Sequence, residues 1–328
     1  MRNYHHLTYS DRCQIYALKQ RGLSQSCIAD ALGVHRSTIS RELRRNSGFR
    51  GYLFNQAQGL HDRRHEYVRS LPRKMTTRMI RLIESKLQLQ WSPQQISGWL
   101  RRHYPRSISH ERIYQYIWAD KRKGGTLYRH LRHHGKKYRK RSSDKANRGR
   151  IPGRVDIETR PDIVAHKTRL GDWEVDTIIG KGRQGALVSM VDRASKYTCI
   201  VNVPSRKAEH VTLAICNRLA KIKRHVLTLT MDNGKEFTQH HIMASRLEAD
   251  TYFAKPYHAW ERGLNEHTNG LIRQYFPKNT NFLTVSEEQV IHVENLLNNR
   301  PRKVLNFQTP EEVFSRLAQK NNAVAIQT

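Results

Sequence analysis

The chain has 328 residues, which is enough for two or three domains. It carries 59 lysine and arginine residues against 28 aspartate and glutamate residues, a formal charge of +31. A charge of this size indicates a polyanionic partner, most naturally nucleic acid. No apolar run approaches the length of a membrane span, which argues against a membrane protein.

The charge is unevenly distributed along the chain. Residues 1–165 carry 36 basic and 12 acidic side chains, whereas residues 166–328 carry 23 and 16. We therefore expect nucleic acid binding mainly in the first half and chemistry in the second. A basic protein of ribosomal type is the alternative, and the carboxylates described below argue against it.

The cysteines predict neither a zinc site nor a disulfide framework, because none of them has C-x-x-C spacing. They are Cys13, Cys27, Cys199 and Cys216. The first residues also lack the apolar core of a signal peptide. We expect free thiols and a cytoplasmic location.

Residues 7–45 have the pattern of a helix-turn-helix, within a DNA-binding domain expected over residues 1–60. Ser10 is placed to cap a first helix and Ser24 to cap a second. Gly33 permits the tight turn that follows the second helix.

A third helix is expected after this turn, with Ile39 and Leu43 facing the core. Such a helix suits the major groove, where its early residues reach base edges and its arginines contact phosphates. The alternative is an ordinary three-helix bundle with a solvated basic face. The residues expected to bind DNA are Arg36, Ser37, Thr38, Ser40, Arg41, Arg44 and Arg45.

Residues 61–120 are predicted to be helical and to contain a second helix-turn-helix. Ser92, Pro93 and Gln95 form a good helix start, with a cap, a proline at the first position and a capping box. Ser109 can cap a later helix. A purely structural helical domain is the alternative, so DNA contact by this module stays open.

Residues 121–165 are expected to form a basic linker or arm. Residues 121–150 contain 13 lysines and arginines and one acidic residue, with the densest run at 136–141. Apolar residues are too few for a core, so this segment would order on the phosphate backbone. A solvated tether without defined contacts is the alternative.

Residues 166–328 have the pattern of an α/β domain with a mixed sheet. The order of strands and helices matches the ribonuclease-H-like arrangement, in which the first and fourth strands lie side by side. Strands are expected at 173–180, 186–192, 197–203, 225–232 and 250–254, and helices at 207–222 and 238–248.

Three carboxylates stand out in this second half. Asp176 lies within an apolar strand, Asp232 ends another and precedes an Asn-Gly turn, and Glu266 opens a helix-like stretch. On a ribonuclease-H-like fold, Asp176 and Asp232 become neighbours. Such carboxylates can hold two divalent cations, most naturally Mg²⁺ with Mn²⁺ as an alternative, which clamp the oxygens of a phosphodiester.

Other charged residues compete for or support this role. Asp172 and Glu174 alternate with Asp176 and could share its strand face. Glu236 is expected to face solvent or local backbone, and Glu261 lies on a different helical face from Glu266. Arg273, seven residues after Glu266, could hold a DNA phosphate or be a surface arginine.

Several motifs together resemble the insertion-sequence-30 family of bacterial DDE transposases. Val175, His35 and His267 depart from the usual family pattern, and none of them belongs to the three carboxylates. The similarity spans nearly the whole chain. The motifs are STISREL at 37–43, GDWEVD at 171–176, MDNGKEF at 231–237, WERGLNEHTNGLIRQYFPK at 260–278, LNNRPRK at 297–303 and TPE at 309–311.

This resemblance implies a function and a site. Asp176, Asp232 and Glu266 would be the metal-binding catalytic triad. The N-terminal domain would bind double-stranded DNA at the element's terminal inverted repeats. The enzyme would cleave the 3′ ends with water and join the freed 3′-hydroxyls to target DNA. A bacterial, nucleoid-associated protein is expected, acting as a homodimer or a higher homo-oligomer because two DNA ends are handled together.

Two other functions remain to be weighed. A DNA-binding self-repressor or a catalytically inactive element product would need no triad, and the triad is intact. A retroviral-type integrase would carry an N-terminal zinc-binding His/Cys module, which this chain lacks, and a stand-alone nuclease would not need two DNA-binding modules.

Overall fold

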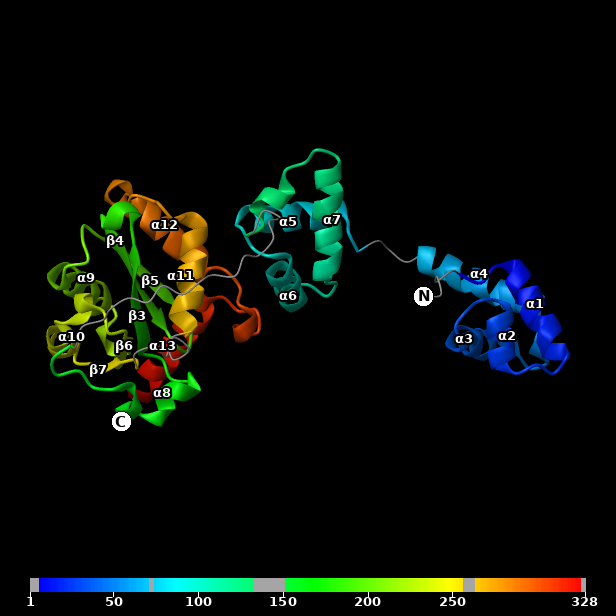
Figure 1. Ribbon diagram of the computed structural model, residues 1–328, viewed down its shortest axis with the longest axis horizontal. Coiled ribbons are helices and arrows are strands. Elements are labelled where there is room, and N and C mark those ends of the chain that lie inside the picture. Colours follow the sequence, from blue (N-terminus) through cyan, green and yellow to red (C-terminus); the bar gives the residue numbers. More distant parts are fainter. Residues whose placement is uncertain (1–5, 71–73, 133–150, 256–262, 326–328) are drawn as a thin grey trace. The chain divides into compact units, whose positions relative to one another are not determined.

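The computed structural model describes residues 6–70, 74–132, 151–255 and 263–325 (Figure 1). The chain divides into two compact units, residues 1–73 and 74–328. The basic run at 136–141 and Glu261 lie outside the described residues. Within the described segments, no helix has both the length and the apolar character that crossing a bilayer requires.

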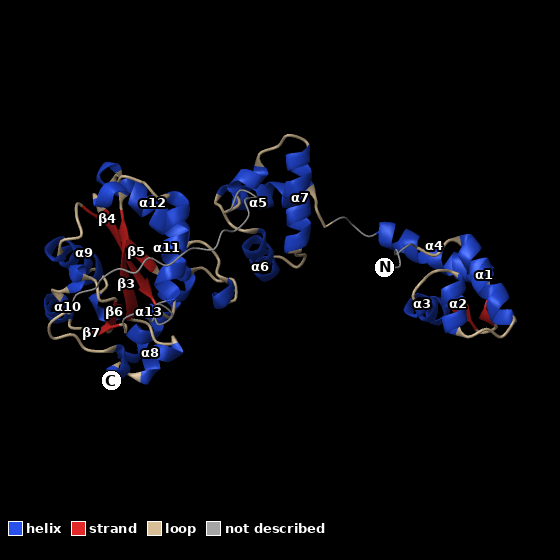
Figure 2. Cartoon of the chain, in the orientation of Figure 1, coloured by secondary structure: helices blue, strands red, loops and turns tan. Residues whose placement is uncertain are grey.

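The first unit is built mainly of helices (Figure 2). Its elements are α1 (Tyr9–Gln20), α2 (Gln25–Ala31), α3 (Arg36–Asn46), the hairpin strands β1 (Ser47–Gly48) and β2 (Gly51–Tyr52), and α4 (Phe54–Ser70). Ile15, Ile28 and Ile39 are fully buried between the first three helices. Ala57 of α4 joins the same core, so the expected boundary at residue 60 falls inside a helix.

The helix starts in this unit agree with the sequence except at α1. Ser24 caps α2 by accepting the Cys27 N–H, and Gly33 has a positive φ of 65°, as expected. The prediction that Ser10 caps the first helix is wrong. Thr8 is the cap of α1, because its hydroxyl forms a capping box with Asp11, and Ser10 lies inside the first turn.

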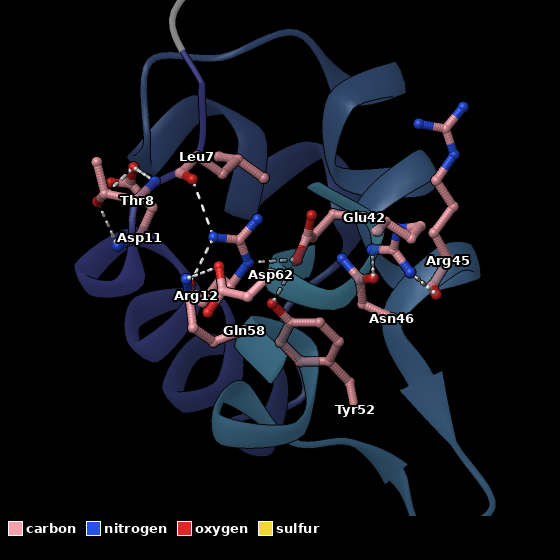
Figure 3. A network of polar contacts seen from close by, with 11 residues as sticks. Leu7, Thr8, Asp11, Arg12, Glu42, Arg45, Asn46, Tyr52, Gln58 and Asp62 are labelled. Carbon is pink, nitrogen blue, oxygen red and sulfur yellow. Dashed lines mark hydrogen bonds and ion pairs between the residues drawn. The ribbon is translucent and has the colours of Figure 1, made fainter. Parts of the chain in front are cut away.

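A buried polar network fastens α3 to the rest of the unit (Figure 3). The Arg12 Nε of α1 lies 2.9 Å from Glu42 Oε1 on the inner face of α3, and both side chains are buried. The Tyr52 hydroxyl donates to the same oxygen, and Arg12 also donates to the Gln58 side chain and the Leu7 carbonyl. Burial beside Glu42 raises the pKa of Tyr52.

The second unit begins with three helices, α5 (Thr77–Gln88), α6 (Pro93–His103) and α7 (His110–Arg122). The predicted start of α6 is confirmed: Ser92 and Gln95 form the capping box, with Pro93 at the first position. Ser109 caps α7 by accepting an N–H of its first turn, as expected.

One face of α6 packs against a loop near the end of the chain. A Cβ added to Gly98 would lie 2.2 Å from the Phe307 ring, so the close approach requires glycine. Arg102 donates to the Phe307 carbonyl (3.0 Å), and Arg300 Nε donates to Gln95 (3.0 Å). This module is therefore attached to the rest of its unit through α6, and DNA contact by it stays a prediction.

The remainder of the second unit is a five-stranded mixed sheet with helices on both faces, in the order β5-β4-β3-β6-β7. β3 pairs antiparallel with β4 and parallel with β6, so the prediction that the first and fourth strands are neighbours is confirmed. The elements are α8 (Asp162–His166), β3 (Asp172–Ile179), β4 (Ala186–Asp192), β5 (Thr198–Val203), α9 (Ala208–Ala220), β6 (Thr228–Met231), α10 (His240–Leu247), β7 (Asp250–Phe253), α11 (Gly263–Tyr275), α12 (Glu287–Asn298) and α13 (Pro310–Ala325).

The two faces of the sheet are covered by different helices (Figure 1). Val175 of β3 packs in a core with α9, α10 and α13. Ile178 of the same strand packs in a second core with α11 and α12. Because side chains alternate along a strand, the even-numbered residues of β3 face α11. This parity decides which acidic side chains share a face with the helix that carries Glu266.

We expect Arg12→Ala to destabilise the first unit by about 3–5 kcal/mol, because it leaves the Glu42 carboxylate buried without its partner. Amide hydrogen exchange in α1 and α3 of the full chain would then be faster. Arg21→Ala, at the exposed end of α1, is the matched control and should change stability by no more than about 0.5 kcal/mol. Equal protection in the two variants would contradict the role assigned to the ion pair.

Candidate active site

The register between β3 and β6 brings two acidic residues to one place. Asp172 is paired with Thr228 and Glu174 with Thr230. Continued by two residues, the same register sets Asp176 beside Asp232, at the point where β6 ends. Neighbouring strands lie about 4.8 Å apart, so the two side chains are close neighbours.

The Asp176 carboxylate lies on the sheet face that α11 covers, where the Asn269 amide contacts it. The alternation that turns Val175 toward α9 turns Asp176 toward α11, and the same alternation, continued one residue past Met231 at the end of β6, would turn Asp232 to this face. Both aspartates are half-buried. Glu266 lies in the first turn of α11, the helix that covers this face of the sheet.

Polar contacts fix α11 alongside β3. The Asn265 N–H donates to Glu174 (3.2 Å), and the Asn269 side chain donates to Asp176 Oδ2 (2.8 Å). Glu266 lies three residues before Asn269, on the same side of the helix. Its position along β3 is therefore between the levels of Glu174 and Asp176, and its side chain is exposed.

These residues have the donor atoms that a hard divalent cation prefers. Carboxylate oxygens are the usual protein ligands of Mg²⁺, and the β3–β6 register, continued past its last pair at Glu174 and Thr230, would set Asp176 and Asp232 side by side. Within the described residues, no group of three or more His, Cys, Asp or Glu side chains is close enough to hold a metal ion. The pairing of β3 with β6 accounts for the expected proximity of Asp176 and Asp232. The Glu266 side chain does not join them in a three-residue cluster within the described residues.

The turn after β6 holds the Asp232 carboxylate at the end of the strand. The Gly234 N–H donates to Asp232 Oδ1 (2.9 Å), and the Asn233 side chain donates to the Ala254 carbonyl. A Cβ on Gly234 would lie 2.5 Å from a Glu236 oxygen and 2.8 Å from Asp232 Oδ1. A side chain at position 234 would therefore have to displace one or both of these carboxylates.

The expectation that Glu236 faces solvent or local backbone is wrong. Its side chain is 5% exposed, accepts the Thr177 hydroxyl (2.8 Å) and pairs with Arg206. The turn Lys235–Phe237 buries Phe237 in the core and so directs Glu236 toward β3. The available sequence signal for the burial of Glu236 was Phe237, an aromatic residue directly after it.

The rival acids of β3 take part in structural ion pairs. Asp172 is fully buried and pairs with Arg169, and its Oδ1 accepts the Thr228 hydroxyl. Glu174 is almost fully buried and pairs with Arg193 (2.9 Å). The carboxylate oxygens of Asp172 and Glu174 are thus occupied by hydrogen bonds and ion pairs within the fold. This leaves Asp176 as the acid of β3 that is proposed to act with Asp232.

Arg273 has a structural contact at the far end of β3. Its guanidinium donates to the Ile179 carbonyl (2.7 Å) and to the Pro277 carbonyl (3.2 Å), and it lies over the Phe282 ring. These contacts fasten the last turn of α11 to the sheet. A DNA phosphate would have to use the remaining N–H groups.

The predicted DNA-binding residues lie on the outer face of α3. Thr38 is half-buried and the others are exposed; the set is Arg36, Ser37, Thr38, Ser40, Arg41, Arg44 and Arg45. Arg41 folds back to donate to the Ser37 carbonyl and hydroxyl. His35 caps the helix by accepting the Ser37 N–H (3.2 Å), which leaves the early residues of α3 on the surface.

Two residues of the site were missed by the sequence analysis. Asn269 donates to Asp176 and accepts the hydroxyl of Ser189, which pairs with Asp176 across the β3–β4 ladder. Asn269 lies one helical turn after Glu266, and that spacing was the available signal. Ser189 gave none, because a serine in a buried strand is not distinctive.

Two families match this chain. The family described as a helix-turn-helix domain matches residues 3–46, and the family described as an integrase core domain matches residues 167–259. The first match covers α1 to α3, and the second covers the whole five-stranded sheet.

Several full-length relatives are also similar. The transposase for insertion sequence element IS4351 of Bacteroides fragilis is 44% identical, over 97% of this chain and 98% of its own. Transposase InsI for element IS30A of Escherichia coli (strain K12) is 36% identical, over 95% and 84%. The transposase for element IS1086 of Cupriavidus metallidurans is 34% identical, over 96% and 95%.

We expect Asn269→Leu to weaken Mn²⁺ binding about 10–100-fold, because Asp176 loses the amide that orients it. Calorimetric titration of the full chain would measure the change. Asn217→Leu, on the exposed face of α9, is the matched control and should bind Mn²⁺ as the unmodified chain does. Equal affinities in the two variants would show that the amide does not position a metal ligand.

Proposed function

The chain belongs to the insertion-sequence-30 family of DDE transposases, and we propose that Asp176, Asp232 and Glu266 are its catalytic residues. The protein is a DNA transposase with a helix-turn-helix domain and an integrase core. Under this proposal the three carboxylates hold two divalent cations, with Mg²⁺ the natural choice and Mn²⁺ an alternative.

One observation carries the assignment. The parallel register of β3 and β6 sets Asp176 beside Asp232, and the Asn269 amide ties the helix of Glu266 to Asp176. This register supports the proposal because, continued to the end of β6, it would bring residues 56 positions apart along the chain to one sheet face. Glu266 would complete the set from α11 when its exposed side chain turns toward the pair.

The chain's own residues have distinct tasks in the proposed reaction. Asp232, fixed by the Gly234 N–H, and Asp176, fixed by Asn269, supply ligand oxygens at a constant separation. Two cations, when bound, would activate the attacking oxygen and stabilise the leaving oxygen of the phosphodiester. The attacking oxygen would be water during 3′-end cleavage and a DNA 3′-hydroxyl during strand transfer. No covalent intermediate on the protein is required.

The first unit would recognise the element's ends. Binding to the terminal inverted repeats would place α3 in the major groove, with its early residues on base edges and its later arginines on phosphates. Because strand transfer joins two ends to one target, we expect a homodimer or a higher homo-oligomer on the DNA.

We expect Asp232→Asn to reduce Mg²⁺-dependent cleavage of element ends at least about a thousandfold, because one shared ligand loses its charge. Binding of the terminal repeat without metal should be unchanged, as gel shift would show. Asp250→Asn, at the exposed start of β7, is the matched control and should cleave normally. Normal cleavage by Asp232→Asn would refute the metal assignment.

The two ends of α3 should respond differently to arginine removal. Arg36→Ala, in the first turn, should lower the preference for the terminal repeat over unrelated DNA by about 1–3 kcal/mol. Arg44→Ala, near the end, should weaken binding to all duplexes alike and reduce the salt dependence by about one phosphate contact. Titrations at several salt concentrations with both duplexes measure both effects. The same loss on both duplexes for Arg36→Ala would contradict the proposed groove orientation.

A further inference from the structure

A large cavity lies beside the start of α11, between residues of this helix and of β3. Its volume is about 730 Å³, within the range of small-molecule sites. The wall is formed by Glu174 of β3, by Gly263 and His267 of α11, by the segment 157–167 and by residues near Arg302. Glu174, whose side chain accepts the Asn265 N–H of α11, lies on this wall and is two residues from Asp176 along β3.

The wall of this cavity is predominantly cationic. Five basic side chains face three carboxylates, and two of these carboxylates already have partners. Glu174 pairs with Arg193, and Glu158 pairs with Lys255. The basic residues are Arg160, Lys167, Arg193, Lys196 and Arg302.

Arg302 is a buried charge without a carboxylate partner. It is 8% exposed, and its guanidinium donates to the Leu297 carbonyl (3.1 Å). Its Nε has no hydrogen-bond acceptor, and no ion pair with a carboxylate forms within the part of the chain that the structure describes. Burial, together with Arg300 and Arg132, lowers the pKa of Arg302 to about 9. A buried guanidinium normally requires a counter-charge.

Arg193 and Lys196 add two further cations on another wall. Arg193 is 4% exposed, and its Nε has no acceptor among the described residues even though its Nη1 pairs with Glu174. Lys196 donates to the Arg193 carbonyl. Burial and the nearby Lys167 lower the pKa of Lys196 to about 8. Burial and neighbouring cations on the cavity wall therefore disfavour the charge of Lys196.

The start of α11 adds to the positive potential. Gly263 and Leu264, in its first turn, line the cavity, and α11 has 13 residues. The N-terminus of such a helix carries a partial positive charge and favours anions. An anion in the cavity would thus be attracted by the helix as well as by the arginine and lysine side chains.

We propose that this cavity binds a phosphate group. The phosphate could belong to the DNA strand that passes Glu266 or could be free inorganic phosphate, since both present the same oxygens. The DNA source rests on the proposed function, whereas the cavity and its charges do not. A DNA phosphate held here would position the strand relative to Asp176 and Asp232 without contacting the reacting atoms.

Free phosphate is tested by thermal unfolding of the full chain. Sodium phosphate should raise the unfolding temperature more than sodium chloride of equal ionic strength, because a ligand stabilises the state that binds it. The extra shift should be lost in Lys196→Gln and in Lys167→Gln; Lys167 is exposed, so its replacement should not disturb folding. Lys221→Gln, an exposed lysine at the end of α9, is the matched control and should keep the shift.

A DNA phosphate is tested with end duplexes that each carry one neutral methylphosphonate near the cleavage site. Binding is measured in EDTA, so the outcome does not depend on cleavage or on the metal assignment. At one position the substitution should weaken binding of the unmodified chain and of Lys221→Gln about tenfold. The same substitution should leave Lys196→Gln, which has already lost the contact, almost unaffected.

The outcomes separate the two sources. A methylphosphonate position coupled to Lys196 supports a DNA phosphate in the cavity, and a phosphate-specific shift without such a position supports a free-phosphate site. No phosphate-specific shift together with equal methylphosphonate effects in Lys196→Gln and Lys221→Gln would overturn the proposal. Loss of cleavage in Asp232→Asn would still be interpretable in each case, because it reports on different residues.

Discussion

The parallel pairing of β3 with β6 is the constraint on which the proposed chemistry depends. It brings Asp176 and Asp232 together from distant parts of the chain, on the face that α11 covers. Two carboxylates that share one place repel each other, and a cation bound between them would relieve that repulsion. The two hydrophobic cores of the sheet hold the strands in this register. The fold thus creates a place where a divalent cation is stabilised.

Buried polar contacts orient the elements that act on DNA. In the first unit, the Arg12–Glu42 pair fixes the inner face of α3 and leaves its basic face outward. In the second unit, the hydrogen bond from Asn269 to Asp176 fixes the position of α11, and hence of Glu266, along β3. In both cases a short set of hydrogen bonds determines where a functional side chain is presented. The cationic cavity beside α11 extends this arrangement toward the phosphate backbone.

Much of the fold followed from the sequence because local signals were strong. Capping residues such as Ser24 and Ser92 marked helix starts, and apolar strands in an α/β order predicted that β3 and β6 are neighbours. The sequence could not indicate contacts that depend on tertiary packing. Ser10 and Thr8 are both suitable N-cap residues for α1, and the sequence alone did not show that Thr8 takes this position. The direction of the Glu236 side chain is set by the burial of Phe237, which follows it.

The central claim is that Asp176 and Asp232 share divalent cations, and anomalous diffraction measures this most directly. Crystals of the full chain with element-end DNA and Mn²⁺ should show anomalous peaks about 2.1 Å from oxygens of both aspartates, with Glu266 joining them. Peaks only at other acidic residues, or on one aspartate without the other, would contradict the account.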